Sequence, residues 1–116
     1  MENKKIEALI SADEYLYNLK EAIEKISTLI DEGKEGEGIK LIPSVADGID
    51  WVVQVINLTK EIQKEAIEID TINEYLEELV EALENEDYIL VGDLFNYEIL
   101  PILKGAHEKI KLSIAI

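Results

Sequence analysis

Two stretches decide the fold of this chain: residues 13–24 read DEYLYNLKEAIE, and residues 73–84 read NEYLEELVEALE. Seven of the twelve aligned positions are identical, and Ser11 and Thr71 stand at the same distance before them. In both stretches apolar residues recur at spacings of three and four, which is the pattern of one buried face of an α-helix. The two stretches therefore predict two amphipathic helices related by an internal duplication.

The similarity continues downstream, where Leu41-Ile42-Pro43 matches Ile99-Leu100-Pro101 and a glycine follows each proline, at Gly48 and Gly105. Each copy then predicts a helical hairpin, the first over about 11–69 and the second over about 71–116. A single hairpin leaves its apolar face uncovered, so the two should pack together. We expect an all-α fold, an antiparallel up-down four-helix bundle, that forms one domain over residues 1–116.

Capping residues and apolar spacing predict the limits of the first two helices. The first should run from a capping box at Ser11 to about Glu32, or unbroken from Lys4, with Gly33 as its C′ residue. The second should begin near Gly38 or at Ser44. Isoleucines at helical spacing, out to Ile62 and Ile69, extend it to about Asp70.

The third and fourth helices are predicted in the same way, over about 71–84 and from Tyr88 to near the C-terminus. Asp87 is the expected N-cap of the fourth helix, which begins in the most apolar stretch of the chain, residues 86–103. Pro101 lies inside this helix, where it removes an N–H and meets the carbonyl of Tyr97, at a cost of about 3 kcal/mol. We therefore expect the last helix to be kinked at Pro101.

The composition is that of a globular protein, with 47% hydrophobic and 32% charged residues, but the charge balance is strongly acidic. Twenty-six acids against eleven lysines and no arginine give a net charge of −15. This charge repels nucleic acids and anionic membranes, so any partner selected by electrostatics should be basic. The absence of cysteine excludes disulfides and thiolate chemistry. With no signal-like N-terminus and no long apolar run, we expect a cytoplasmic protein.

Two acidic pairs are candidate metal ligands: Glu21 with Glu24 on the first helix, and Asp47 with Asp50 on the second. If these faces met, their carboxylates could hold Mg²⁺. The pattern resembles the E-x-x-E…E-x-x-D signature of all-α nucleotide pyrophosphatases of the MazG and dimeric dUTPase type, although Asp47 stands where that family has glutamate. The resemblance implies an Mg²⁺-dependent nucleotide hydrolase, which is the enzymatic alternative.

Polar residues also occur within the apolar stretch of the fourth helix: Asp93, Asn96, Tyr97 and Glu98. Asp93 and Tyr97 are one turn apart and can share a hydrogen bond. Such residues either form a polar network that fixes helix register or contact a ligand or partner. The second possibility includes a small-molecule binder.

Trp51 and His107 are the remaining candidates. Gly48, three residues before Trp51, costs about 1 kcal/mol inside a helix and predicts that another helix passes close by. Trp51 is then either a core residue at that contact or part of an interaction surface. The residue three positions before His107 is Lys104 rather than a glutamate, so the Glu-x-x-His motif of ferritin-like metal sites is absent. We therefore expect a surface histidine.

The stretch from Asp87 to Leu103, together with Pro43 to Trp51, resembles small, acidic, uncharacterised all-helical proteins of Gram-positive bacteria, a resemblance that implies no activity. No catalytic signature emerges from the residues. We therefore expect a non-enzymatic helical module without a cofactor, with Mg²⁺ only under the hydrolase alternative. Its expected partner is a protein, basic or a second copy as a homodimer, with no nucleic acid and no membrane.

Overall fold

The computed structural model describes residues 2–115, and these are helical throughout except for short connections, with no β-strand among them. The predicted all-α class is therefore confirmed. Four long helical segments account for most of this part of the chain, and short helices link them. In chain order the elements are α1 (Glu2–Asp31), α2 (Glu35–Ile39), α3 (Ile42–Leu58), the 3₁₀ turn η1 (Lys60–Ile62), α4 (Ile72–Glu84), α5 (Tyr88–Asp93), the π-helical segment η2 (Leu94–Ile99) and α6 (Leu100–Ile114).

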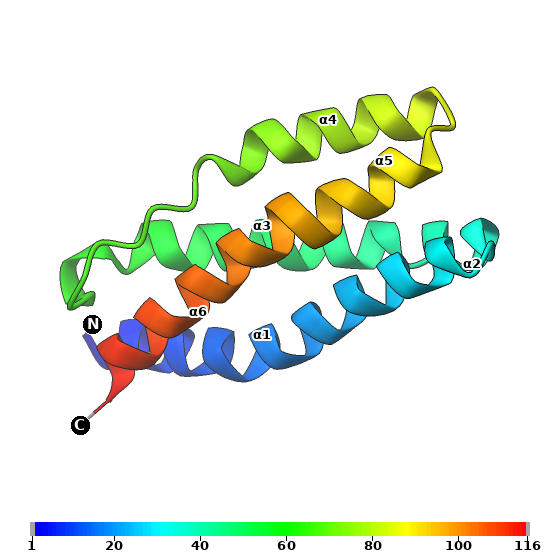
Figure 1. Cartoon of the computed structure of the whole chain (residues 1–116). Helices are drawn as coiled ribbons and strands as arrows, with labels where there is room; N and C mark the ends of the chain where they lie inside the picture. The colour runs from blue at the N-terminus through cyan, green and yellow to red at the C-terminus, as the bar shows by residue number, and fades with distance from the viewer. Residues whose placement is uncertain (1, 116) are drawn as a thin grey trace.

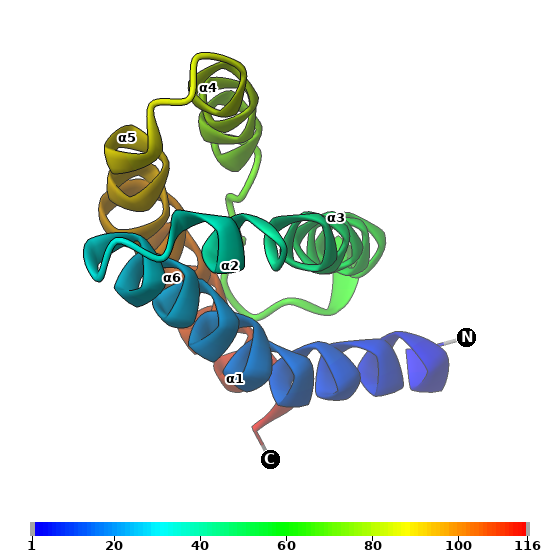
Figure 2. The same cartoon turned by 90° about the vertical axis from the view of Figure 1, so that its right-hand side faces the viewer.

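Helix α1 is the element against which most of the others pack. Its 30 residues, at about 1.5 Å each, match the longest dimension of the molecule, 45 Å. It contacts α2, α3, α5 and α6, while α4 packs on α5 and η2. Both termini lie at one end of the molecule, and α2 and the α4–α5 turn lie at the other (Figure 1). In the view turned by 90°, α5 lies between α4 and α1 (Figure 2).

Neither Ser11, the predicted capping box of the first helix, nor its counterpart Thr71 caps a helix with its side chain. Ser11 lies inside α1, because Leu9 and Ala12 on either side of it are both fully buried and carry the apolar face through this position. The alternative of an unbroken first helix is therefore the correct one. Thr71 does precede α4, but its side chain makes no capping hydrogen bond; the backbone carbonyl of Asp70 accepts from Asn73 N instead.

Two other terminal signals are confirmed. Gly33 has φ +79°, and the amides of Gly33 and Lys34 donate to the carbonyls of Ile30 and Leu29, which is the Schellman arrangement that ends a helix at a left-handed residue. Asp87 is the N-cap of α5, and its Oδ1 accepts a hydrogen bond from Leu90 N at 3.2 Å.

The second long helix is shorter than predicted: α3 ends at Leu58 rather than near Asp70. Side chains beyond it take over its last carbonyls. Thr59 Oγ1 donates to Val55 O at 2.7 Å, and Gln63 Nε2 donates to Ile56 O at 2.8 Å. After η1, residues 63–71 are not helical, and in Ile67-Glu68-Ile69-Asp70 the isoleucines are buried and the acids exposed. That alternation has a period of two, so the helical interpretation of Ile69 was wrong.

The two prolines occupy the first turns of α3 and α6, where a missing N–H costs little. Before Pro101 the helix adopts the wider π geometry, with Leu100 N donating to Phe95 O five residues earlier. Helical residues thus continue through α5, η2 and α6, and the π segment accommodates the proline without interrupting this run of helical residues.

The core is built from aliphatic residues on the inner faces of all the long helices. Leu16 is fully buried, and Leu76, sixty residues later, is half-buried and packs against the same core. Leu19 and Leu79 are both buried. Within residues 2–115 no helix is both long and apolar enough to cross a membrane.

Candidate functional site

A close contact between α1 and α3 at Gly48 lies beside an open hollow on the surface of the molecule. The hydroxyl of Tyr15 lies directly over this buried glycine, and a Cβ atom at position 48 would come within 2.0 Å of Tyr15 Oη. Only glycine allows the approach, which confirms that another helix passes close to Gly48. The ring of Tyr15 in turn meets Trp51 edge to face, with centroids 5.5 Å apart and planes at 89°.

The Trp51 groove is the solvent-open hollow beside this contact, with a volume of about 560 Å³. Its lining comes from two helices: Ser11 and Tyr15 from α1, and Ser44, Asp47, Gly48 and Trp51 from α3. Trp51 is 38% exposed, so it is neither a core residue nor a free surface side chain. The groove therefore combines two aromatic rings, three hydroxyls and one carboxylate.

This combination of groups can bind a ligand through several kinds of contact. Aromatic faces next to a carboxylate attract cations, and the hydroxyls can fix the orientation of a polar ligand. The arrangement can therefore hold a cationic or mixed polar and apolar group.

The four acids proposed as metal ligands do not come together. Glu21 and Glu24 are exposed on α1, because α1 and α3 meet through their apolar faces and leave the acids outside. On α3, Asp47 lines the groove, while Asp50 Oδ2 accepts a hydrogen bond from Gln54 Nε2 at 2.9 Å. Among residues 2–115 no three His, Asp or Glu side chains are placed to share a metal ion.

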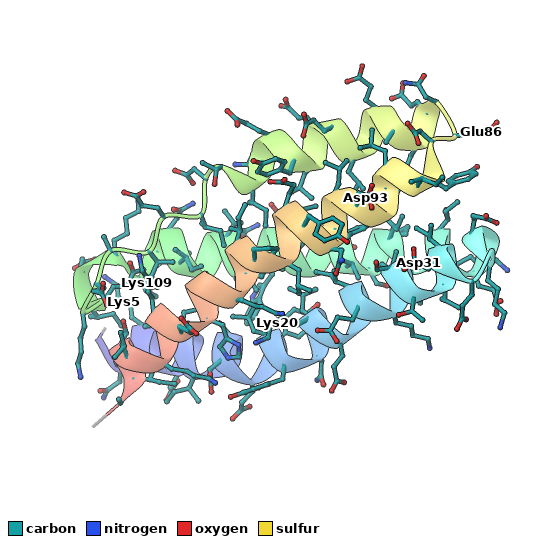
Figure 3. All side chains as sticks on the ribbon, in the orientation of Figure 1. Lys5, Lys20, Asp31, Glu86, Asp93 and Lys109 are labelled. Carbon is teal, nitrogen blue, oxygen red and sulfur yellow. The ribbon has the colours of Figure 1, made fainter. Side chains whose placement is uncertain are left out.

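The polar residues of the fourth helix occupy a different surface, at the end of α5 and in η2. Asn96 and Glu98 are half-buried, whereas Asp93 and Tyr97 are exposed, Tyr97 to 67%. Figure 3 labels Asp93 on its helix, away from the α1–α3 contact. The π geometry changes the stacking that an α-helix gives residues four apart, and the expected Asp93–Tyr97 hydrogen bond is not among those of the described residues. Glu98 instead acts on α4, where its carboxylate raises the pKa of Tyr75.

His107 is buried, so the expectation of a surface histidine is wrong. It is only 1% exposed, and its Nε2 lies 2.8 Å from Oδ1 of Asp13 on α1. Because a carboxylate only accepts, the imidazole donates from Nε2, and its buried Nδ1 has no hydrogen-bond partner among residues 2–115. The sequence did contain the signal: His107 lies four residues after Leu103 and three before Ile110, both fully buried.

Charged neighbours surround this histidine. The ring of Tyr17 packs edge to face against the imidazole, with the ring centroids 4.6 Å apart. The ammonium groups of Lys20 and Lys111 lie 5.3 and 4.8 Å from the centre of the tyrosine ring. Burial lowers the pKa of His107, the hydrogen bond to Asp13 acts in the opposite direction, and the two lysines lower it further. The group therefore ties α1 to α6 in its neutral form.

Sequence reasoning singled out Trp51 and Asp47 but missed Tyr15, Ser11 and Ser44 as their neighbours. Comparison with known proteins finds no curated protein and no solved structure that matches this chain. Residues 7–109, most of the chain, match the family described as "Domain of unknown function (DUF8042)". The protein therefore belongs to this DUF8042 family, whose function is unknown.

Proposed function

We propose that this protein is a non-enzymatic interaction module that binds a basic segment of a partner protein in the Trp51 groove. The observation that carries the proposal is the composition of the groove, where Asp47 lies beside the perpendicular rings of Tyr15 and Trp51. A lysine or arginine side chain can place its aliphatic stem on these rings and its charge near the carboxylate.

The charge of the whole chain supports a basic partner. With a net charge of −15, the surface potential is negative over most approaches and should speed the encounter with a cationic segment. Figure 3 shows acidic side chains along every long helix. The contribution of such charges is screened by salt, so the association should weaken as ionic strength rises.

The other candidate functions have less support. A nucleotide hydrolase of the MazG type needs gathered carboxylates, and in the described part of the chain no third His, Asp or Glu side chain joins Glu21 and Glu24 in a possible metal site. A small molecule could use the same groove, but the lining is shallow and open rather than enclosed. Self-association remains an outcome to test, because Ile89 and Tyr97 are exposed to 76% and 67% on α5 and η2.

The architecture we propose for the module is an antiparallel up-down bundle of two duplicated hairpins, bent at Pro101. Supporting this, Pro43 and Pro101 lie in the first turns of α3 and α6, at equivalent positions of the two repeats, and these helices have 17 and 15 residues.

The test is a titration with a lysine-rich octapeptide, monitored by fluorescence of Trp51, the only tryptophan, and by calorimetry. Asp47→Asn should weaken binding by about two- to fivefold, as expected for a partly exposed charge pair. Asp93→Asn makes the same charge change outside the groove and should leave the affinity unchanged. Trp51→Ala should weaken binding by about tenfold or more, whereas Tyr97→Ala should not.

Equal effects of Asp47→Asn and Asp93→Asn would refute the groove as the site and reduce the interaction to bulk charge. The absence of binding, accompanied by a dimer in sedimentation experiments that Tyr97→Ala dissociates, would instead favour self-association through α5 and η2.

A further inference from the structure

The α3 wall of the Trp51 groove has a counterpart on α6. Its four α3 residues, Ser44, Asp47, Gly48 and Trp51, each have an equivalent 58 residues later, at Ile102, Gly105, Ala106 and Lys109. The same spacing of 58 relates Pro43 to Pro101, and those prolines occupy the first turns of the two helices. All four of the later residues line one hollow of about 200 Å³ on α6.

On α6 this surface is partly covered by the chain itself. The non-helical residues 64–68 lie along it: Lys64 N donates to Ser113 Oγ at 3.1 Å, and Lys109 Nζ donates to Ala66 O at 3.2 Å. Ile67 follows these two hydrogen-bonded positions in the chain and precedes α4. Its side chain turns inward and is only 5% exposed, while the side chain of Glu68 points out. Figure 3 labels Lys109 on α6 beside this connection. The segment thus binds α6 through its backbone and one branched side chain.

The α3 surface is covered differently: the side chain of Tyr15, from α1, lies over Gly48, and no residue of a non-helical segment lines this groove among those that the structure describes. Residues 4–8 precede the first repeated stretch by the same distance as residues 64–68 precede the second. They are helical and belong to α1. They cannot present alternate side chains to α3 in the way that residues 64–68 do to α6. The hollow on α3 is accordingly the larger of the two, about 560 Å³ against 200 Å³.

We infer that the Trp51 groove binds a non-helical, extended segment of its partner, which packs one branched aliphatic side chain against the rings of Tyr15 and Trp51, in the way that Ile67 packs on α6. The inference rests on the proposed function and specifies its ligand. Lys109, which donates to the backbone of the internal segment, is replaced on α3 by Trp51, whose indole N–H is also a donor. Gly105 is replaced by Asp47, which adds a site for a basic side chain beside the aliphatic one.

Three octapeptides test this assignment with the intact protein. The first carries a central isoleucine between lysines, the second has glycine in place of that isoleucine at the same charge, and the third keeps the isoleucine but replaces the lysines with glutamates. The first should bind at least about tenfold more tightly than the second, because it buries a whole aliphatic side chain. The third should not bind. Transferred nuclear Overhauser effects on the first should show the strong sequential Hα–HN contacts of an extended backbone.

A variant adds a second, independent readout. Trp51→Phe keeps an aromatic ring but removes the indole donor, and calorimetry should show a several-fold loss of affinity for the first peptide. Gly105→Ala, on the equivalent α6 surface with open space around the added methyl, is the control and should leave the affinity for the first peptide unchanged.

Equal affinity for the isoleucine and glycine peptides, or helical HN–HN contacts in the bound peptide, would overturn the extended-segment assignment while leaving a basic-segment groove intact. If neither lysine peptide binds, both the assignment and the proposed function fail.

Discussion

Glu86 is a left-handed residue that glycine should replace with a gain in stability. It lies at the tip of the turn between α4 and α5 (Figure 3), with φ +54°, the only positive φ at a non-glycine residue among those the structure describes. The amides of Glu86 and Asp87 donate to the carbonyls of Leu83 and Ala82, so Glu86 has the same place at the end of α4 as Gly33 at the end of α1.

The magnitude follows from this equivalence. An L-residue in the left-handed region costs about 1–2 kcal/mol, and glycine removes that cost but adds freedom to the unfolded chain worth about 0.4–1 kcal/mol. Glu86→Gly should therefore raise the free energy of unfolding by about 0.5–1 kcal/mol. In a domain of this size the melting temperature should rise by roughly 2–8 °C.

Urea unfolding followed by circular dichroism measures the effect, with Glu86→Gln as the matched control. The glutamine variant removes the charge but keeps Cβ, so it isolates any relief of repulsion among the neighbouring acids. The glycine variant should exceed the glutamine variant by about 0.5 kcal/mol or more. Equal stabilities for the two, or a glycine variant less stable than the parent, would refute the left-handed turn at Glu86.

Three further predictions concern the helix contacts and the buried histidine. Gly33→Ala should lower the free energy of unfolding by about 1 kcal/mol because of its φ of +79°, whereas Gly105→Ala, inside α6 with open space around it, should raise it by about 1 kcal/mol in the same urea assay. Gly48→Ala should push the Tyr15 hydroxyl aside and shift the emission of Trp51; an unchanged spectrum and unchanged peptide affinity would contradict the contact. Burial lowers the pKa of His107 below its ordinary value of 6.5, so below that pH the unfolded state binds more protons than the folded state. The contribution of His107 to stability should therefore be complete above pH 6.5 and decline as the pH falls towards the folded-state pKa. The charged groups near it are Asp13, Lys20 and Lys111. Denaturation curves between pH 7 and 5 should be flatter for His107→Gln than for the parent; parallel curves would exclude the histidine as the cause.

Local signals predicted those parts of the fold that depend on a few neighbouring residues. Gly33 and Asp87 act through hydrogen bonds within five residues, and the sequence alone was sufficient for both. The capping box at Ser11 failed because burial of Leu9 and Ala12 outweighs a cap worth about 1 kcal/mol. The end of α3 depends on Thr59 and Gln63 reaching back to carbonyls, which hydrophobic spacing does not report.

The candidate site was predictable only in part, because it requires the register of α1 against α3. The sequence marked Gly48 as a close contact and Trp51 as either a core residue or part of an interaction surface, but not that Tyr15 would be the side chain over the glycine. His107 was misassigned for a related reason: its partner Asp13 is 94 residues away, on another helix. Such pairings follow from packing rather than from local sequence.

Amide chemical shifts of the ¹⁵N-labelled protein, recorded while the lysine–isoleucine octapeptide is added, test the proposed role of the groove most directly. The largest changes should fall on residues 11–18 of α1 and 44–51 of α3. A second hollow, between α4 and α5, has the acids Glu78, Glu81 and Asp87 in its lining and is the natural competitor for a basic peptide. Changes centred on residues 78–94, or spread evenly over the acidic surface, would contradict binding at Trp51.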